Sequence, residues 1–171
     1  EIDETACECK SLTNFFIKNS LKLAMNFLTK SFLQKFPKLN IFVLMNVSLP
    51  SLADDVFSSN TELDSATLNF VNLSDLWELK FGTKRNFLLN LNSNRLVNVS
   101  TMFADSFMAI DNQIRHLHVR NSTSMITIGK NKLETISCDE NSKVKAFYAV
   151  NNSLADLQCI QSMKFMKILH L

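Results

Sequence analysis

Apolar residues recur along most of the chain in one short template. The segment 144–157 (VKAFYAVNNSLADL) has apolar residues at its positions 1, 4, 6, 11 and 14, and Asn at position 9. The same template fits segments that start at Leu39, Leu63, Asn86, Ala104 and Thr123. Over these six copies, 28 of the 30 apolar positions are apolar, against about 14 expected from composition. The pattern predicts a repeat fold.

Two further copies extend the repeat to both sides. A weaker copy starts near Leu12, and a truncated one starts at Met166 and stops at Leu171. The spacings between successive starts are 27, 24, 23, 18, 19, 21 and 22 residues. We therefore expect a cysteine-containing cap segment over residues 1–11, followed by repeats over residues 12–171, about seven of them full and one truncated.

The template predicts a short strand in each copy. Positions 4 and 6, such as Leu89 and Leu91, lie on one side of a strand and point into the core. An Asn at position 9 can bond backbone groups of neighbouring copies at the turn that leaves the strand. Val47 and Val71 hold this position in two copies and cannot do so. The predicted column of structural asparagines is Asn94, Asn112, Asn131 and Asn152.

This pattern resembles the leucine-rich repeat, LxxLxLxxNxL with a period of 20 to 29 residues. The resemblance implies an α/β solenoid, a horseshoe with a parallel concave sheet and a mostly irregular or short-helical convex side. Copies of 18 and 19 residues leave no room for a helix on their return path. Apolar spacing over residues 21–36 predicts a helix, either on the convex side or, as the alternative, along a membrane surface.

Composition narrows the function classes. The formal net charge is +2 and 20% of residues are charged, which excludes a strongly basic nucleic-acid module. With two glycines, a glycine-rich phosphate loop is excluded as well. No run of about 18 apolar residues occurs, so we expect no membrane insertion.

Two of the four cysteines match in register. Cys138 and Cys159 both hold position 16 of adjacent copies, and side-by-side positions bring Cα atoms within disulfide range. We predict a disulfide there, with two buried free thiols as the alternative. Cys7 and Cys9 are too close in sequence to bridge without strain, and they resemble part of an N-terminal cysteine cap.

Five N-glycosylation sequons occur, a modest excess for this composition. Together with the matched cysteines, they favour a secreted, extracellular glycoprotein. The sequon asparagines are Asn46, Asn72, Asn98, Asn121 and Asn151.

Template positions 3, 5, 7 and 8 point outward and form the expected partner-binding row on the concave sheet. The row is nearly uncharged, which favours a protein partner over nucleic acid. Its predicted members are Val43, Met45, Thr67, Asn69, Phe70, Asn90, Asn92, Met108, Thr127 and Tyr148. Trp77 is expected to pack in the core or on the convex side.

No pattern of catalytic residues is present, so we expect no enzymatic activity and no cofactor. His116 and His118 could chelate a metal, but the register puts them in a turn beside Leu117, and no third ligand is indicated. We therefore predict that both histidines lie on the surface and that they bind no metal.

Residues 104–159 contain two short repeats and then a cysteine after Ile136-Ser137, an arrangement similar to the secreted leucine-rich-repeat immune proteins of mosquitoes and flies. That resemblance implies innate immunity in haemolymph, with a complement-like protein or another leucine-rich-repeat chain as partner. The family uses a cysteine motif and a coiled coil for this, and the sequence stops before either. The alternative is the extracellular part of a leucine-rich-repeat receptor or adhesion protein.

Overall fold

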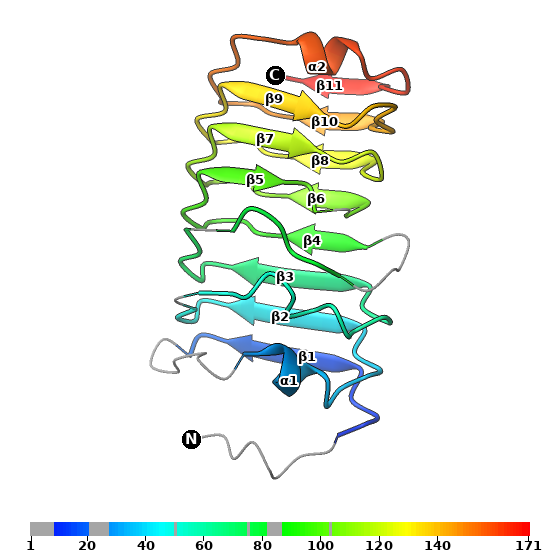
Figure 1. Cartoon of the computed structure of the whole chain (residues 1–171). Coiled ribbons are helices and arrows are strands. Elements are labelled where there is room, and N and C mark those ends of the chain that lie inside the picture. Colours follow the sequence, from blue (N-terminus) through cyan, green and yellow to red (C-terminus); the bar gives the residue numbers. More distant parts are fainter. Residues whose placement is uncertain (1–8, 21–27, 50, 75, 82–86, 103) are drawn as a thin grey trace.

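The computed structural model describes residues 9–20, 28–49, 51–74, 76–81, 87–102 and 104–171. Within these ranges the chain winds into a stack of coils, and each coil places one strand beside the strand of a neighbouring coil (Figure 1). Eight strands form one sheet in which all neighbours are parallel. In spatial order they are β1 (Asn14–Lys18), β2 (Ile41–Met45), β3 (Ser65–Asn69), β4 (Leu88–Asn90), β6 (Ser106–Met108), β8 (Met125–Thr127), β10 (Ala146–Tyr148) and β11 (Ile168–His170).

A second, three-stranded parallel sheet lies on the opposite side of the coils (Figure 1). It consists of β5 (Asn98–Ser100), β7 (His116–Val119) and β9 (Thr135–Cys138). These strands occupy the return paths of the copies that start at Asn86, Ala104 and Thr123. The two shortest copies therefore return as extended chain, in agreement with the prediction that they hold no helix.

The eight-stranded sheet uses the template register throughout. Each of its strands begins at position 3 of a copy, so the strands align residue by residue, as in the pairing of Ser65 with Leu88 and of Met125 with Ala146. Positions 4 and 6 consequently point to the same side in every coil. The described residues thus form a mostly parallel-stranded repeat solenoid with little helix, which confirms this coarse part of the predicted fold.

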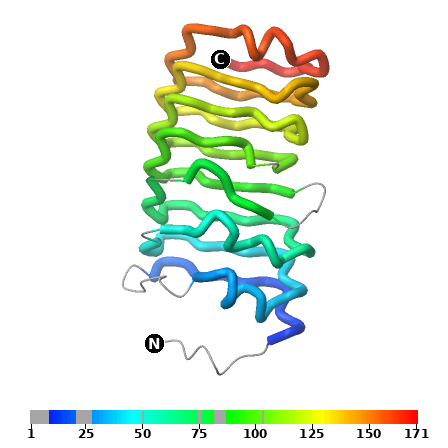
Figure 2. Tube along the Cα trace, in the orientation of Figure 1, coloured from blue at the N-terminus to red at the C-terminus, as the bar shows by residue number. Residues whose placement is uncertain are grey.

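The core lies inside the coils and runs along the stack from Leu28 to Met163. Figure 2 shows the trace of these coils. Leu89 and Leu91, at positions 4 and 6, are fully buried, and so are the equivalent residues of the neighbouring full copies. Phenyl rings fill the N-terminal part, where Phe15 stacks on Phe42 with ring centroids 5.3 Å apart and Phe57 meets Phe42 edge to face. Each coil covers the apolar side chains of the next, so the coils stabilise one another.

The predicted asparagine column links successive coils. The Asn131 side-chain amide donates to the carbonyl oxygens of Ala109 and Ile128, while its Oδ1 accepts from the Ile114 N–H at 3.0 Å. Asn94, Asn112 and Asn152 make equivalent bonds. The structural role is thus confirmed at all four positions, although Asn131 and Asn152 are half-buried rather than buried.

Position 8 has a left-handed backbone in seven copies. Its φ lies between 54° and 61°, a region that residues other than Gly rarely adopt. The seven residues are Asn19, Asn46, Phe70, Ser93, Asp111, Lys130 and Asn151. The turn that leaves each strand therefore has one conserved shape, and no described glycine supplies it.

Only short helices occur among the described residues. α1 (Lys30–Leu33) begins after Thr29, whose Oγ1 accepts from the Phe32 N–H, and α2 (Gln158–Gln161) lies beside β9. α1 falls inside the helix predicted over residues 21–36, of which residues 21–27 lie outside the described part. None of the described helices is long and apolar enough to cross a bilayer.

Candidate functional site

The outward side of the eight-stranded sheet carries almost no charge. We call its positions 3 and 5 the sheet face, because these positions alternate with the buried position 4. Its members are Asn14, Phe16, Ile41, Val43, Ser65, Thr67, Leu88, Asn90, Ser106, Met108, Met125, Thr127, Ala146, Tyr148, Ile168 and His170. None of them is Asp, Glu, Lys or Arg, although these types make up 20% of the chain. The sheet face is therefore a continuous neutral surface.

Aromatic side chains lie at both ends of this surface. Phe16 is 54% exposed, and the ammonium of Lys18 lies 5.6 Å from the centre of its ring. At the other end Tyr148 meets His170 edge to face, with ring centroids 5.2 Å apart. Rigid aromatic groups of this kind contribute strongly to protein interfaces.

Most of the residues predicted for partner binding do lie on this side. Thr67, Asn90, Met108, Thr127 and Tyr148 occupy position 5 and are half-buried, as residues of a sheet surface usually are. Phe70, Met45 and Asn92 lie at the strand exits, where Phe70 is 55% exposed and the other two are half-buried.

The structure corrects two members of the predicted row. Val43 is buried, because its short side chain lies in the ladder between Phe16 and Thr67. Asn69 is also buried, since its Oδ1 accepts a 3.0 Å hydrogen bond from the Asn92 N–H of the next coil. Neither side chain is available for contact with a partner.

Sequence reasoning missed several members of the sheet face. Ile41, Leu88, Met125 and Ile168 at position 3, with Phe16 at position 5, complete the apolar surface. The signal was present in the template, because position 3 alternates with position 4 as position 5 does. These omissions make the neutral surface larger and more apolar than predicted.

The five sequon asparagines divide between two parts of the surface. Asn46, Asn72 and Asn151 lie in left-handed turns after the strands, and Asn98 and Asn121 lie on the return side. All are exposed except Asn46, which is half-buried and donates to Asn19 Oδ1 at 3.1 Å. None lies at position 3 or 5.

The two histidines lie in strand β7, so the predicted turn is wrong. The residues at positions 13 to 16 of neighbouring coils pair with one another in register. His116 and His118 therefore lie in the three-stranded sheet. His116 bonds Thr135, and His118 contacts Ser137 Oγ through Nδ1 at 2.9 Å.

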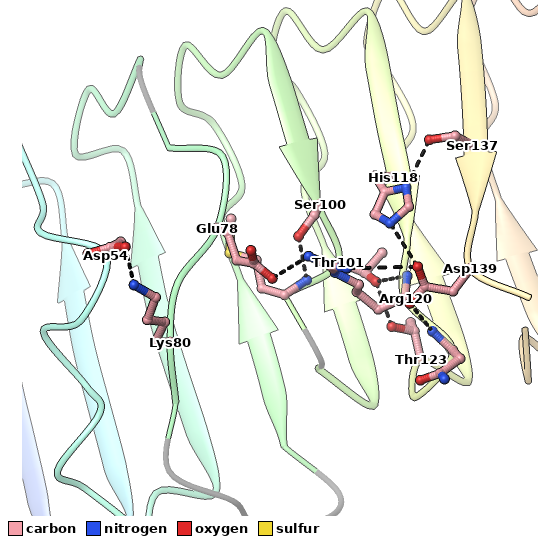
Figure 3. A network of polar contacts seen from close by, with 12 residues as sticks. Asp54, Glu78, Lys80, Ser100, Thr101, His118, Arg120, Thr123, Ser137 and Asp139 are labelled. Atoms are coloured by element: carbon pink, nitrogen blue, oxygen red, sulfur yellow. Dashed lines mark hydrogen bonds and ion pairs between the residues drawn. The ribbon is translucent and has the colours of Figure 1, made fainter.

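His118 belongs to a polar network on the return side (Figure 3). Its Nε2 lies 3.0 Å from Asp139 Oδ1, and Asp139 also lies 3.8 Å from the Arg120 guanidinium. Arg120 in turn contacts Glu78 at 2.7 Å. Trp77 stacks on His118, with ring centroids 6.4 Å apart, and is 49% exposed. Trp77 thus packs on the return side and not in the core.

Ser137, His118 and Asp139 lie at the hydrogen-bond distances of a Ser-His-Asp triad. Their further contacts with Arg120 indicate a structural role, in which the network holds neighbouring coils together. Asp139 contacts His118, Arg120 and the Asn121 N–H, so its carboxylate has three partners within the protein. Arg120 links the segment around Glu78 to β7 and β9. No group of three His, Cys, Asp or Glu that could hold a metal occurs in the described ranges.

Cys138 and Cys159 form a disulfide with Cα atoms 5.8 Å apart, which confirms the predicted pair. A hollow of about 820 Å³ opens beside it, with Ile136 and Phe165 among its lining residues and charges of both signs around them. Cys9 is disulfide-bonded. The expectation about Cys7 and Cys9 involves Cys7, which lies outside the described residues.

Comparisons with known protein families and curated proteins do not assign the chain to a family. No protein-family model matches the chain, and a search of the curated proteins gives no match.

Proposed function

We propose that this chain is a secreted, non-enzymatic leucine-rich-repeat module that binds a protein partner through the sheet face. The repeat type is supported by the one strand that each coil gives to the eight-stranded sheet, the core positions 4, 6 and 11, and the asparagine column at position 9. The single observation that carries partner binding is the neutral sheet face. It has the aromatic and Met content of a protein interface and lacks the cations that nucleic acid requires.

Secretion is supported by two independent features. The disulfide between Cys138 and Cys159 forms in oxidising compartments and is rare in the cytosol. Four sequon asparagines are exposed, and Asn98 and Asn121 lie on the return side, so glycans on these two leave the sheet face open. The proposed setting is insect innate immunity, supported by the two short copies within residues 104–159 and by Cys138 after Ile136-Ser137.

A glycan placed on the sheet face tests the proposal. Met125→Asn completes a sequon with Ile126 and Thr127 at position 3, in the centre of the surface. Protein produced in insect cells and immobilised should capture a specific partner from haemolymph. The glycosylated variant should lose this partner.

The matched control carries Met125→Asn together with Thr127→Ala, which removes the sequon and should restore most of the capture. Tyr148→Asp provides an unglycosylated variant of the same surface, and Phe70→Asp provides one at a strand exit beside it. A partner that still binds the glycosylated variant would place recognition elsewhere and overturn the proposal.

A further inference from the structure

Trp77 lies across the outer side of the three-stranded sheet. Its carbonyl oxygen accepts the Ser100 N–H at 3.0 Å, so its backbone runs beside the edge strand β5. Its ring stacks on His118 of β7, with planes inclined by 27°. The Trp77 ring therefore extends across β5, from the open edge of the sheet to β7.

The burial of Ser100 supports this placement. Val99 points into the core, so strand alternation turns Ser100 outward, yet Ser100 is fully buried. Ser100 lies between the Trp77 backbone on one side and His118 of β7 on the other, so a Trp77 ring that reaches His118 passes over Ser100. One face of the ring is occupied in this way, while the side chain as a whole remains 49% exposed.

Asn98 is the outward position of β5 that precedes Ser100. It is two residues before Ser100 on β5, a step of about 6.5 Å, and alternation places both on the outer side of the sheet. Asn98 pairs with His116, as Ser100 pairs with His118, so the two rows are adjacent. Asn98 is exposed and begins the sequon Asn98-Val99-Ser100.

We propose that Asn98 carries an N-linked glycan and that its first sugar packs against the exposed part of the Trp77 ring. In the transfer, the Asn98 side-chain nitrogen bonds C1 of the sugar and loses a proton. The pyrophosphate of a lipid-linked oligosaccharide leaves from C1 with the bonding electrons. The step occurs on the nascent chain, before Ser100 is covered. This inference rests on the proposed secretion.

The chemistry of the two groups is complementary. A pyranose ring presents C–H groups on one face, and the face of an indole ring is electron-rich, so the two attract weakly. Contact would also remove apolar surface of Trp77 from water. The glycan thereby explains a large aromatic side chain left half-exposed beside a polar network.

Trp77 is the only tryptophan, so its fluorescence reports this contact directly. The protein is secreted from insect cells, and glycan occupancy at each sequon is measured by peptide mass spectrometry. Acrylamide quenching of Trp77 is then compared between the wild type and Asn98→Gln. We expect Asn98 to be occupied and quenching to rise about twofold in the variant, because a sugar on one face covers about half of the exposed ring.

Asn151→Gln is the matched control, because it removes a sequon from a turn of the other sheet and should leave quenching unchanged. Enzymatic removal of glycans from folded wild-type protein repeats the test without a substitution. Occupied sequons elsewhere with Asn98 unmodified would overturn this inference and leave secretion standing. Unchanged quenching of glycan-free protein would overturn the contact. Secreted protein with no occupied sequon would overturn the glycan at Asn98, whereas retention of the protein inside the cell would count against secretion itself.

Discussion

The Asn94 side-chain nitrogen donates a 2.7 Å hydrogen bond to the carbonyl oxygen of Leu68 in the coil before it. Its Oδ1 accepts the backbone N–H groups of Val71 and Leu73 from that same coil. One buried amide therefore satisfies backbone groups that the turn leaves without partners.

Removal of this amide should destabilise the stack. Asn94→Ala leaves the N–H groups of Val71 and Leu73 without their acceptor in a buried turn, and we expect a loss of about 3 kcal/mol in the free energy of unfolding. Urea denaturation followed by circular dichroism measures it. Asn98→Ala in unglycosylated protein is the control and should change stability by less than about 0.5 kcal/mol, since Asn98 is exposed. A similar small change for Asn94→Ala would refute the structural role.

Loss of the disulfide should weaken the last coils first. The bridge between Cys138 and Cys159 spans 21 residues, and its removal by a double substitution to Ser should cost about 3 kcal/mol. Hydrogen exchange should become faster in β10, α2 and β11 than in β3, because each coil is stabilised mainly by its neighbours. Uniform acceleration along the chain would contradict this local effect.

The left-handed position 8 offers a stabilising substitution. Lys130 has φ of 55°, where Asn is tolerated better than Lys, and three other copies already have Asn there. We expect Lys130→Asn to raise the free energy of unfolding by about 0.5 to 1 kcal/mol. Lys132→Asn, two residues later and exposed, is the matched control and should bring no gain. Equal effects at the two positions would argue against a backbone cause.

The pKa values of the two residues in an exposed ion pair should shift in opposite directions. Lys80 Nζ lies 2.7 Å from Asp54 Oδ2, and this hydrogen bond, with the attraction of the charges, lowers the pKa of Asp54 and raises the pKa of Lys80. The Asp54 contribution to stability is therefore present above the ordinary aspartate pKa and lost as the pH falls through the lowered value. The Lys80 contribution is present below the ordinary lysine pKa and lost as the pH rises through the raised value.

NMR titration of the Asp54 carboxyl carbon measures the first of these directions. Lys80→Met should return the pKa of Asp54 to its ordinary range, and high salt should do the same in part, because both groups are exposed. Asp54 with an ordinary pKa in wild-type protein would show that the pair does not persist in solution.

The strand register could be read from the sequence because a slip of one residue would exchange core and surface. Leu89 and Leu91 flank Asn90, so only one register buries both leucines and leaves the Asn outside. The same argument holds in each copy. The position 9 asparagines were equally predictable, since a buried amide at a turn has few other partners than backbone groups.

The second sheet could not be read in this way. The segment His116–Val119 is short, and it becomes a strand because the neighbouring copies have nearly equal length and bring their return paths into register. The burial of Val43 and Asn69 likewise depends on neighbours from other coils, Phe16 and Asn92. Such contacts between coils are not contained in the pattern of one copy.

The disulfide also determines how the end of the molecule responds to a pulling force. Tension applied at Leu171 would peel β11 away and then reach Cys159. From there the covalent bond carries the load directly to Cys138, so β10 and the residues between the two cysteines bear none of it. Extension of the reduced protein should release this hidden length, whereas the oxidised protein should keep it stored for as long as the disulfide is intact, even after β9 has detached.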